Sequence, residues 1–263
     1  MTEADRPRGP FAGLIETPAR LSPRVLSRDE VAQILQAHRL YAETERRQGR
    51  RADLGSVDLS GLDAAGLNLR RIRMDRAVLR GADFTGAKLQ RANLAGAILR
   101  HARLDGADLS EARLSGANLG SASLTRAILA QAEMEFALMD KATLSDARLQ
   151  GADLSGAVLD GAVLTRTDLR AVNLRGASFQ DARLDEADLR EARLGGAFLA
   201  GASLRGADLR GAYLRLAKLD GADLCGADLR DAEGLTPTQI AHAHYDAATK
   251  LPVDVTGAGD GQG

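Results

Sequence analysis

The sequence predicts an all-β solenoid, and three observations support this. From Arg51 to Arg230 the chain divides into 36 consecutive blocks of five residues without an insertion or deletion. The fourth position of the block is Leu in 30 of the 36, and the second position is Ala in 30. Hydrophobic residues make up 44% of the 263 residues but aromatic residues only 3%, so the core must consist of small aliphatic side chains. One block cannot bury its Leu alone, so the chain must coil and stack on itself.

The five-residue period favours short extended segments over helices. Ala and Leu two positions apart point the same way on an extended backbone, and the residue between them points outward. Because five is odd, strict in–out alternation cannot continue from one block to the next, so each block must also turn. Gly opens many blocks, for example Gly81, Gly116 and Gly161, and its freedom in φ and ψ suits a corner. An amphipathic helix would need apolar residues at i, i+3, i+4 and i+7, which a strict five-residue period does not supply.

The residues that carry this pattern resemble those of the pentapeptide repeat family. The motif Ala-(Asp/Asn)-Leu-x-x, as in Gly106–Ser110 and Gly151–Ser155, covers about two-thirds of the chain. The resemblance implies a right-handed quadrilateral β-helix with four blocks in each coil. Residues 51–231 would then form about nine coils, and a rod roughly 43 Å long at about 4.8 Å per coil.

Large apolar residues occupy the outward third position in eight blocks, and five of these lie at multiples of twenty residues from one another. The five are Val78, Ile98, Leu138, Val158 and Phe198. Their spacing favours a coil of twenty residues and an apolar row along one side of the rod, with Asn118 and Ser178 as gaps. We expect this row to be the candidate partner interface, since an aligned apolar row can mark a binding surface.

The ends of the chain predict two helices that cover the terminal coils. Residues 27–50 form the first, because Ser27 and Glu30 read as a capping box. Residues 232–252 form the second, with Thr236 and Gln239 as its capping box and an end near Lys250. Residues 1–26 are expected to be a mobile N-terminal arm and residues 253–263 a disordered tail.

The first coil shows enlarged residues that suit contact with a helix. The second position, which is usually Ala, carries four larger apolar side chains there: Val57, Leu62, Leu67 and Ile72. We expect them to fill a wider interior at the junction with the N-terminal helix. Whether that helix only caps the coil or also covers a side of the rod stays open.

No residue pattern indicates catalysis, a cofactor or a metal. His242 and His244 lie two apart on the expected helix and so point to different faces, and Cys225 lies among acidic residues that should not lower its pKa. No phosphate-binding loop stands out. The chain is therefore expected not to be an enzyme and to bind no small-molecule substrate. Its single Cys fits a cytoplasmic location.

A net charge of −1 and the absence of a long apolar run argue against nucleic-acid binding and against a membrane span. Two functions remain. The favoured one is a protein-interaction scaffold of bacterial type, whose apolar row binds a protein partner or a second copy of the chain as a homodimer. The row could instead be covered by the N-terminal helix or arm, or have no role.

The alternative is a DNA-mimicking protector of a type II topoisomerase, which the family resemblance suggests. We assigned the outward positions to four sides, whose net charges are +1, −1, −2 and +1. Duplex DNA of the same length would carry about 25 negative charges. The charge pattern therefore disfavours DNA mimicry.

Overall fold

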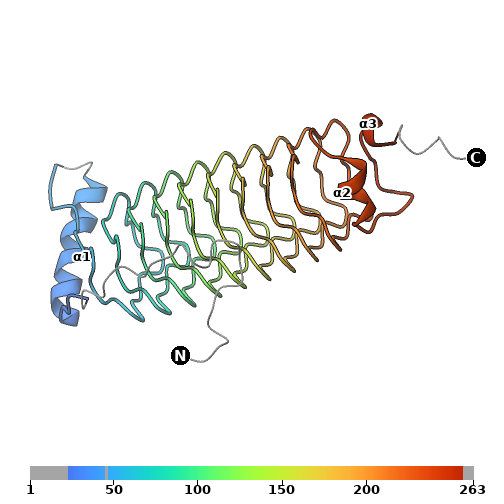
Figure 1. Ribbon diagram of the computed structural model, residues 1–263. Helices are drawn as coiled ribbons and strands as arrows, with labels where there is room; N and C mark the ends of the chain where they lie inside the picture. The colour runs from blue at the N-terminus through green and yellow to red at the C-terminus, as the bar shows by residue number, and fades with distance from the viewer. Residues whose placement is uncertain (1–22, 45–46, 257–263) are drawn as a thin grey trace, which may run out of the picture.

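The computed structural model describes residues 23–44 and 47–256, and shows a straight rod built from stacked coils. Helix α1 (Arg28–Glu43) lies across the N-terminal end of the rod, and helices α2 (Pro237–Ala241) and α3 (Val253–Thr256) lie at its C-terminal end (Figure 1). The described residues between α1 and α2 pair only through single bridge positions, because each block leaves a short extended segment between two turns.

Each coil takes twenty residues. Parallel bridges join third positions of blocks twenty residues apart, from Asp53 with Arg73 to Tyr213 with Glu233. Four blocks therefore close one coil, which is the number that the family resemblance implied. A residue and its counterpart twenty positions later lie directly above one another on the same side of the rod.

In the block Gly151–Ser155 all five backbone N–H groups find an acceptor. The Ala152 N–H donates across the turn to the Leu149 carbonyl at 2.9 Å. The N–H groups of the first, third and fourth residues donate to carbonyls of neighbouring coils at 2.8 to 3.1 Å. The N–H of the fifth residue, Ser155, donates to the Asp153 carboxylate at 2.9 Å.

This last bond explains why Asp or Asn so often lies between Ala and Leu. The side-chain oxygen accepts from the N–H two residues later, which the ladder leaves without a backbone acceptor. Where the third position is Ser or Thr, an Asp on the preceding coil can substitute: Asp105 accepts from the Thr125 N–H at 3.1 Å, and Asp160 from the Gln180 N–H at 3.0 Å.

The corners of the coil impose a left-handed backbone on the first position of the block. All 36 first positions from Ser56 to Asp231 have φ between 54° and 70°. Positive φ at the third residue of a four-residue turn is typical of type II turns, and glycine adopts it without steric cost. The expected role of glycine at the corners is confirmed.

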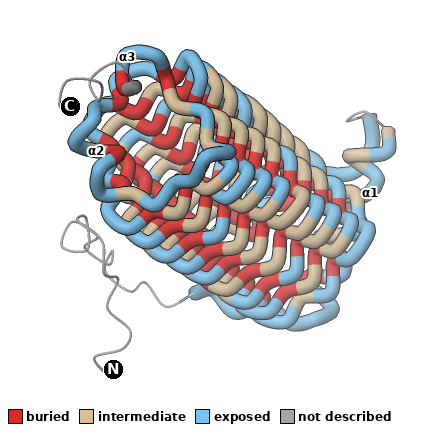
Figure 2. Tube along the Cα trace, turned by 90° about the vertical axis from the view of Figure 1, so that its right-hand side faces the viewer, coloured by how far each residue is buried: buried red, intermediate tan, exposed pale blue. Residues whose placement is uncertain are grey.

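The interior of the rod consists of the second and fourth positions of the blocks. Figure 2 shows buried positions alternating with exposed or half-exposed ones along every coil. The larger residues that replace Leu at the fourth position, Phe84 and Phe179 among them, are completely buried. Thr167, a polar residue facing inward, is also buried, and its hydroxyl donates to the Leu144 carbonyl at 2.8 Å.

Helix α1 caps the first coil. The expected capping box is present, with the Glu30 N–H donating to Ser27 and the Ser27 N–H donating to Glu30. His38 is completely buried against the coil, and its Nδ1 accepts from the Ala52 N–H at 3.1 Å. Before the helix, Arg24 pairs with Val57, so it supplies the strand position that precedes the first coil.

The enlarged residues of the first coil are buried only in part. Val57 and Ile72 are completely buried as expected, and Leu62 is half-buried. Leu67 is 37% exposed, so it does not fill the interior. Helix α1 ends at Glu43, short of the expected residue 50.

The expectation of a helix over residues 232–252 is wrong. The capping box of Thr236 and Gln239 is present, but α2 ends at Ala241. Beyond it the chain returns to the ladder, with His244 bridged to Asp223 and Lys250 bridged to Asp228. These bridges span 21 and 22 residues, so the final coil is irregular.

Side chains at this end donate to backbone carbonyl groups of the last regular coils. The Gln239 side-chain amide donates to the carbonyls of Leu214 and Ala217 at 3.0 and 2.8 Å. The Thr249 hydroxyl donates to the Leu224 carbonyl at 2.9 Å. The short helix α2 and the irregular coil after it therefore cap this end of the rod together.

The expectations for the two tails fall mostly outside the described residues. Residues 1–22 of the expected arm and 257–263 of the expected tail are not described. Residues 253–256, expected to be disordered, form α3 instead, and Val255 is buried. Among the described residues, no helix is long and apolar enough to cross a membrane.

Candidate interaction surface

The structure aligns the five residues of the predicted row on one side of the rod. Val78 is bridged to Ile98, and Leu138 to Val158, while Asn118 and Ser178 fill the two gaps as expected. Ser178 is in turn bridged to Phe198. We call this side, formed by the blocks from 76–80 to 196–200 at intervals of twenty residues, the row face.

The row residues are more buried than the sequence analysis assumed. Val158 is only 9% exposed, and the other four are half-buried. The reason is the register, since residues twenty apart stack closely and cover one another's flanks. Substituting a charged residue at Val158 would therefore disturb folding as well as binding.

The most exposed apolar residue of the central row face is Phe136, which the sequence analysis did not single out. It occupies a corner beside Leu138 and is 59% exposed. Its ring lies over Gly156 on the next coil, with Cε1 2.6 Å from where a Cβ of that glycine would lie. Any side chain at residue 156 would displace the ring.

The charged residues of the row face separate by sign along the rod. Arg80 and Arg100 lie at the fifth position on consecutive coils, Gly120 follows, and Asp140 and Asp160 come next. Among the described residues, none of these four charged side chains makes an ion pair. Burial raises the pKa of Asp160, and the nearby Asp140 and Asp181 carboxylates add to the rise.

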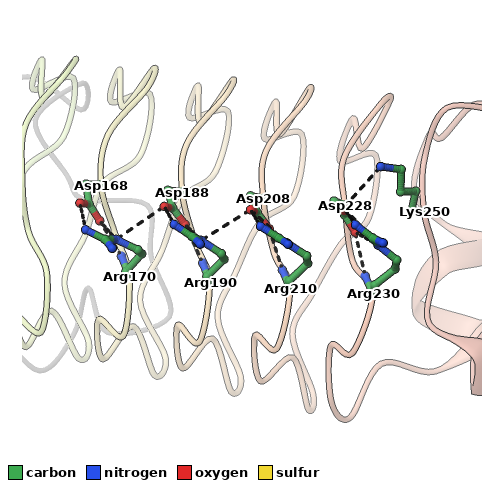
Figure 3. A network of polar contacts seen from close by, with 9 residues as sticks. All are labelled: Asp168, Arg170, Asp188, Arg190, Asp208, Arg210, Asp228, Arg230 and Lys250. Carbon is green, nitrogen blue, oxygen red and sulfur yellow. Dashed lines mark hydrogen bonds and ion pairs between the residues drawn. The ribbon is translucent and has the colours of Figure 1, made fainter.

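The opposite side of the rod has a different charge arrangement. On its last four coils an Asp and an Arg lie at the third and fifth positions of the block, as Figure 3 shows for Asp168 and Arg170 and for the three coils that follow. Each Arg bonds the Asp two residues before it, as at Arg190 and Asp188, 2.6 Å apart. Two of the Arg residues also approach the Asp of the next coil, both at 3.6 Å.

The Asp and Arg side chains of these four coils, which we call the Asp–Arg ladder, neutralise one another's charges. The Arg230 guanidinium and Lys250 contribute to a pKa of about 2 for Asp228, so its carboxylate is ionised and paired at neutral pH. A side whose charges are already paired offers little to a charged partner. The row face differs from these coils, because its four charged side chains have no ion-pair partner in the described structure.

Groups that could support chemistry do not come together in the described part of the chain. No three His, Cys, Asp or Glu residues lie close enough to hold a metal ion there. His242 approaches Asp220, with Nδ1 3.3 Å from its carboxylate. The Asp223 carboxylate raises the pKa of the Cys225 thiol, as the sequence analysis expected of an acidic setting.

Comparison with known proteins identifies the repeat. The family model for pentapeptide repeats matches the chain in eight copies, at residues 52–91, 77–116, 87–126, 107–146, 117–156, 142–181, 182–221 and 207–233. The chain belongs to the pentapeptide repeat family. Membership implies the right-handed quadrilateral β-helix expected above. No curated protein matches the chain.

Solved structures of other pentapeptide repeat proteins are similar to this chain. HetL, from the cyanobacterium Nostoc sp. strain PCC 7120, is 31% identical over 81% of this chain and 93% of its own, with a TM-score of 0.54. HetL is involved in heterocyst differentiation regulation. QnrB1, a plasmid-mediated fluoroquinolone resistance protein, is 22% identical over 76% of this chain and 96% of its own, with a TM-score of 0.33.

The family's repeat explains why sequence reasoning found the row but missed the residues around it. The eight large residues at the third position stand out because that position is usually polar. Phe136 lies at a corner, and Arg80, Arg100, Asp140 and Asp160 occupy the fifth position, where charge is common. Comparing fifth positions at intervals of twenty residues would have revealed the charge separation.

Proposed function

We propose that this pentapeptide repeat protein is a non-enzymatic interaction scaffold, a stiff rod that binds a protein chain through its row face. The observation that supports this is the alignment of Val78, Ile98, Leu138 and Val158 beside the exposed ring of Phe136. Aromatic residues surrounded by half-buried aliphatic ones are typical of the centre of a protein interface. The unpaired charges of the same face supply a polar rim.

The alternative, mimicry of DNA toward a type II topoisomerase, has weaker support. A protein that mimics DNA needs a continuous acidic surface. The acidic residues of the Asp–Arg ladder, however, are each paired with an Arg. A supercoiling assay tests the alternative directly. We expect no inhibition and no protection, whereas inhibition that weakens with added salt would favour the mimic.

Site-specific photo-crosslinking in cells tests the scaffold. A benzophenone amino acid replaces Phe136, and in a control variant it replaces Arg126, which is exposed at a corner on the opposite side of the rod. Both corners have nearly the same φ, 57° and 58°, so the two variants should fold equally well.

We expect irradiation to give defined protein adducts from residue 136 and none from residue 126. Equal adducts at both residues, or none at residue 136, would reject binding through the row face. The mass of the adduct identifies the partner.

A further inference from the structure

We infer that the partner of the row face is a second copy of this chain, packed antiparallel so that the two row faces meet. This inference rests on the proposed function, because it uses the same face. It depends on a symmetry in the residues of that face, which becomes visible once the twenty-residue register is known.

The separation of charge along the row face makes this surface complementary to itself. Reversing one rod against the other about Gly120 places Arg100 opposite Asp140 of the second copy, and Arg80 opposite its Asp160. The twofold symmetry of the pair repeats both contacts, so four new ion pairs form. Two rods packed parallel would instead set Arg beside Arg and Asp beside Asp.

Four of the five row residues have the same symmetry, and Phe198 lies beyond the contact. Reversal about Asn118 places Ile98 opposite Leu138, Val78 opposite Val158 of the second copy, and Asn118 opposite itself. Residues of matching size thus meet across the contact, and two amides lie on the symmetry axis, where they can hydrogen-bond to each other. A self-matching surface of this kind is what a twofold interface requires.

The corner residues agree with this arrangement. Phe136 would face Gly96 of the second copy, which has no side chain of its own and carries only the stem of Arg76, with Cγ 3.5 Å from the ideal Cβ position. The Arg76 guanidinium can then lie against the Phe136 ring as a cation–π contact. The other edge of the row face is the corner formed by the first residues of the blocks that follow it. There Gly81 faces Gly161 of the second copy and His101 faces its Lys141, so no carboxylate lies opposite another.

The desolvated carboxylate of Asp160 gives independent support. Its raised pKa has burial as the main cause, and the neighbouring carboxylates of Asp140 and Asp181 add to it. An arginine from a second copy would lower this cost. On the last four coils of the opposite side, by contrast, each Asp carboxylate is already paired with an Arg of its own coil.

The contact spans the five coils from Val78 to Val158, about 24 Å at roughly 4.8 Å per coil. A contact of this length lies toward the lower end of specific interfaces, so we expect a dimer whose dissociation is measurable. Sedimentation of the full chain over a wide range of concentration, reaching hundreds of micromolar, should show a monomer–dimer equilibrium with no larger species.

Charge reversal tests the arrangement of the pair. Arg100→Asp gives a chain with acidic residues at both 100 and 140, and Asp140→Arg gives one with basic residues at both. Neither native side chain makes an ion pair in the described structure, so neither change should disturb the coil. Each variant alone should dimerise at least tenfold more weakly than the natural chain, because like charges then meet twice.

An equimolar mixture of the two variants should regain the dimer, as one copy of each, since both contacts become attractive. Arg148→Asp, at an exposed position on the opposite side, is the matched control and should leave dimerisation unchanged. Thermal unfolding of each variant verifies that it is folded.

The inference is overturned if the natural chain stays monomeric throughout, if Arg100→Asp dimerises normally, or if the mixture fails to recover. The photo-crosslinking result separates these failures from failure of the proposed function. An adduct of another protein at residue 136 in a chain that stays monomeric would leave the scaffold standing without the homodimer. Absence of any adduct would remove both.

Discussion

At the scale of single residues, the corner of the block is the position under the greatest conformational demand. Of the 36 left-handed corners, 17 are glycine and 19 are not. A non-glycine residue there costs about 1–3 kcal/mol. None of the 19 is Val, Ile or Thr, whose branched side chains tolerate positive φ least. The corners therefore accept polar and even aromatic side chains, but not β-branched ones.

Substituting alanine by glycine should have opposite effects at two positions of the block. Ala171 is an exposed corner with φ of 54°, so Ala171→Gly should raise the free energy of unfolding by up to about 1 kcal/mol as the strain is relieved. Ala130, at a fifth position, is not in the left-handed region, so Ala130→Gly should lower it by roughly 0.5–1 kcal/mol. Chemical denaturation measures both, and equal shifts would contradict the corner argument.

At the scale of elements, the ends of the rod show what sequence signals can and cannot predict. Both capping boxes were predicted from the residues alone, because such a box is a local interaction over four residues. The length of the C-terminal helix was not. Residues 242–250 leave the helix because their backbone groups pair with the last regular coil, and that competition depends on contacts distant in sequence.

The attachment of α1 should weaken in acid because of His38. Burial lowers the pKa of this imidazole, and its neutral Nδ1 accepts the Ala52 N–H. The unfolded state has a pKa of about 6.5 and so binds protons more readily than the folded state. The contribution of His38 is therefore complete above about pH 6.5 and declines as the pH falls toward the lowered pKa of the folded state.

Hydrogen exchange of the Ala52 amide, corrected for its intrinsic rate, should show faster opening at pH 5 than at pH 7. In His38→Asn the side-chain oxygen can accept the same bond without titrating, so opening should change less between the two pH values. Equal acid dependence in both proteins would exclude His38 as the cause.

At the scale of the whole molecule, the core and the surface repeat with different periods. The core repeats every five residues, so its composition and its inward positions were predictable from a single block. The surface repeats every twenty, so the row was predictable only after comparing blocks four apart. Its burial was not predictable, since the exposure of Val158 depends on how closely neighbouring coils cover it.

A charge in the middle of the core should disrupt the rod as a whole. Leu154 is completely buried, so Leu154→Asp should lower the free energy of unfolding by more than about 3 kcal/mol, from lost apolar burial and an unpaired charge. Ala171→Asp, at an exposed corner of the next coil, should change it by less than about 0.5 kcal/mol. Denaturant titration compares them, and similar losses would contradict the assignment of inside and outside.

The two periods also constrain how a gene for such a rod can lengthen. Duplication of one five-residue block preserves every inward Ala and Leu, so the longer chain can still fold. It nevertheless moves everything that follows it by one side of the rod, and so breaks both the apolar row and the Asp–Arg ladder at that point. Duplication of twenty residues adds a coil and keeps all four sides in line. Selection for a working surface should thus favour growth in steps of twenty residues, although selection for folding alone would accept steps of five.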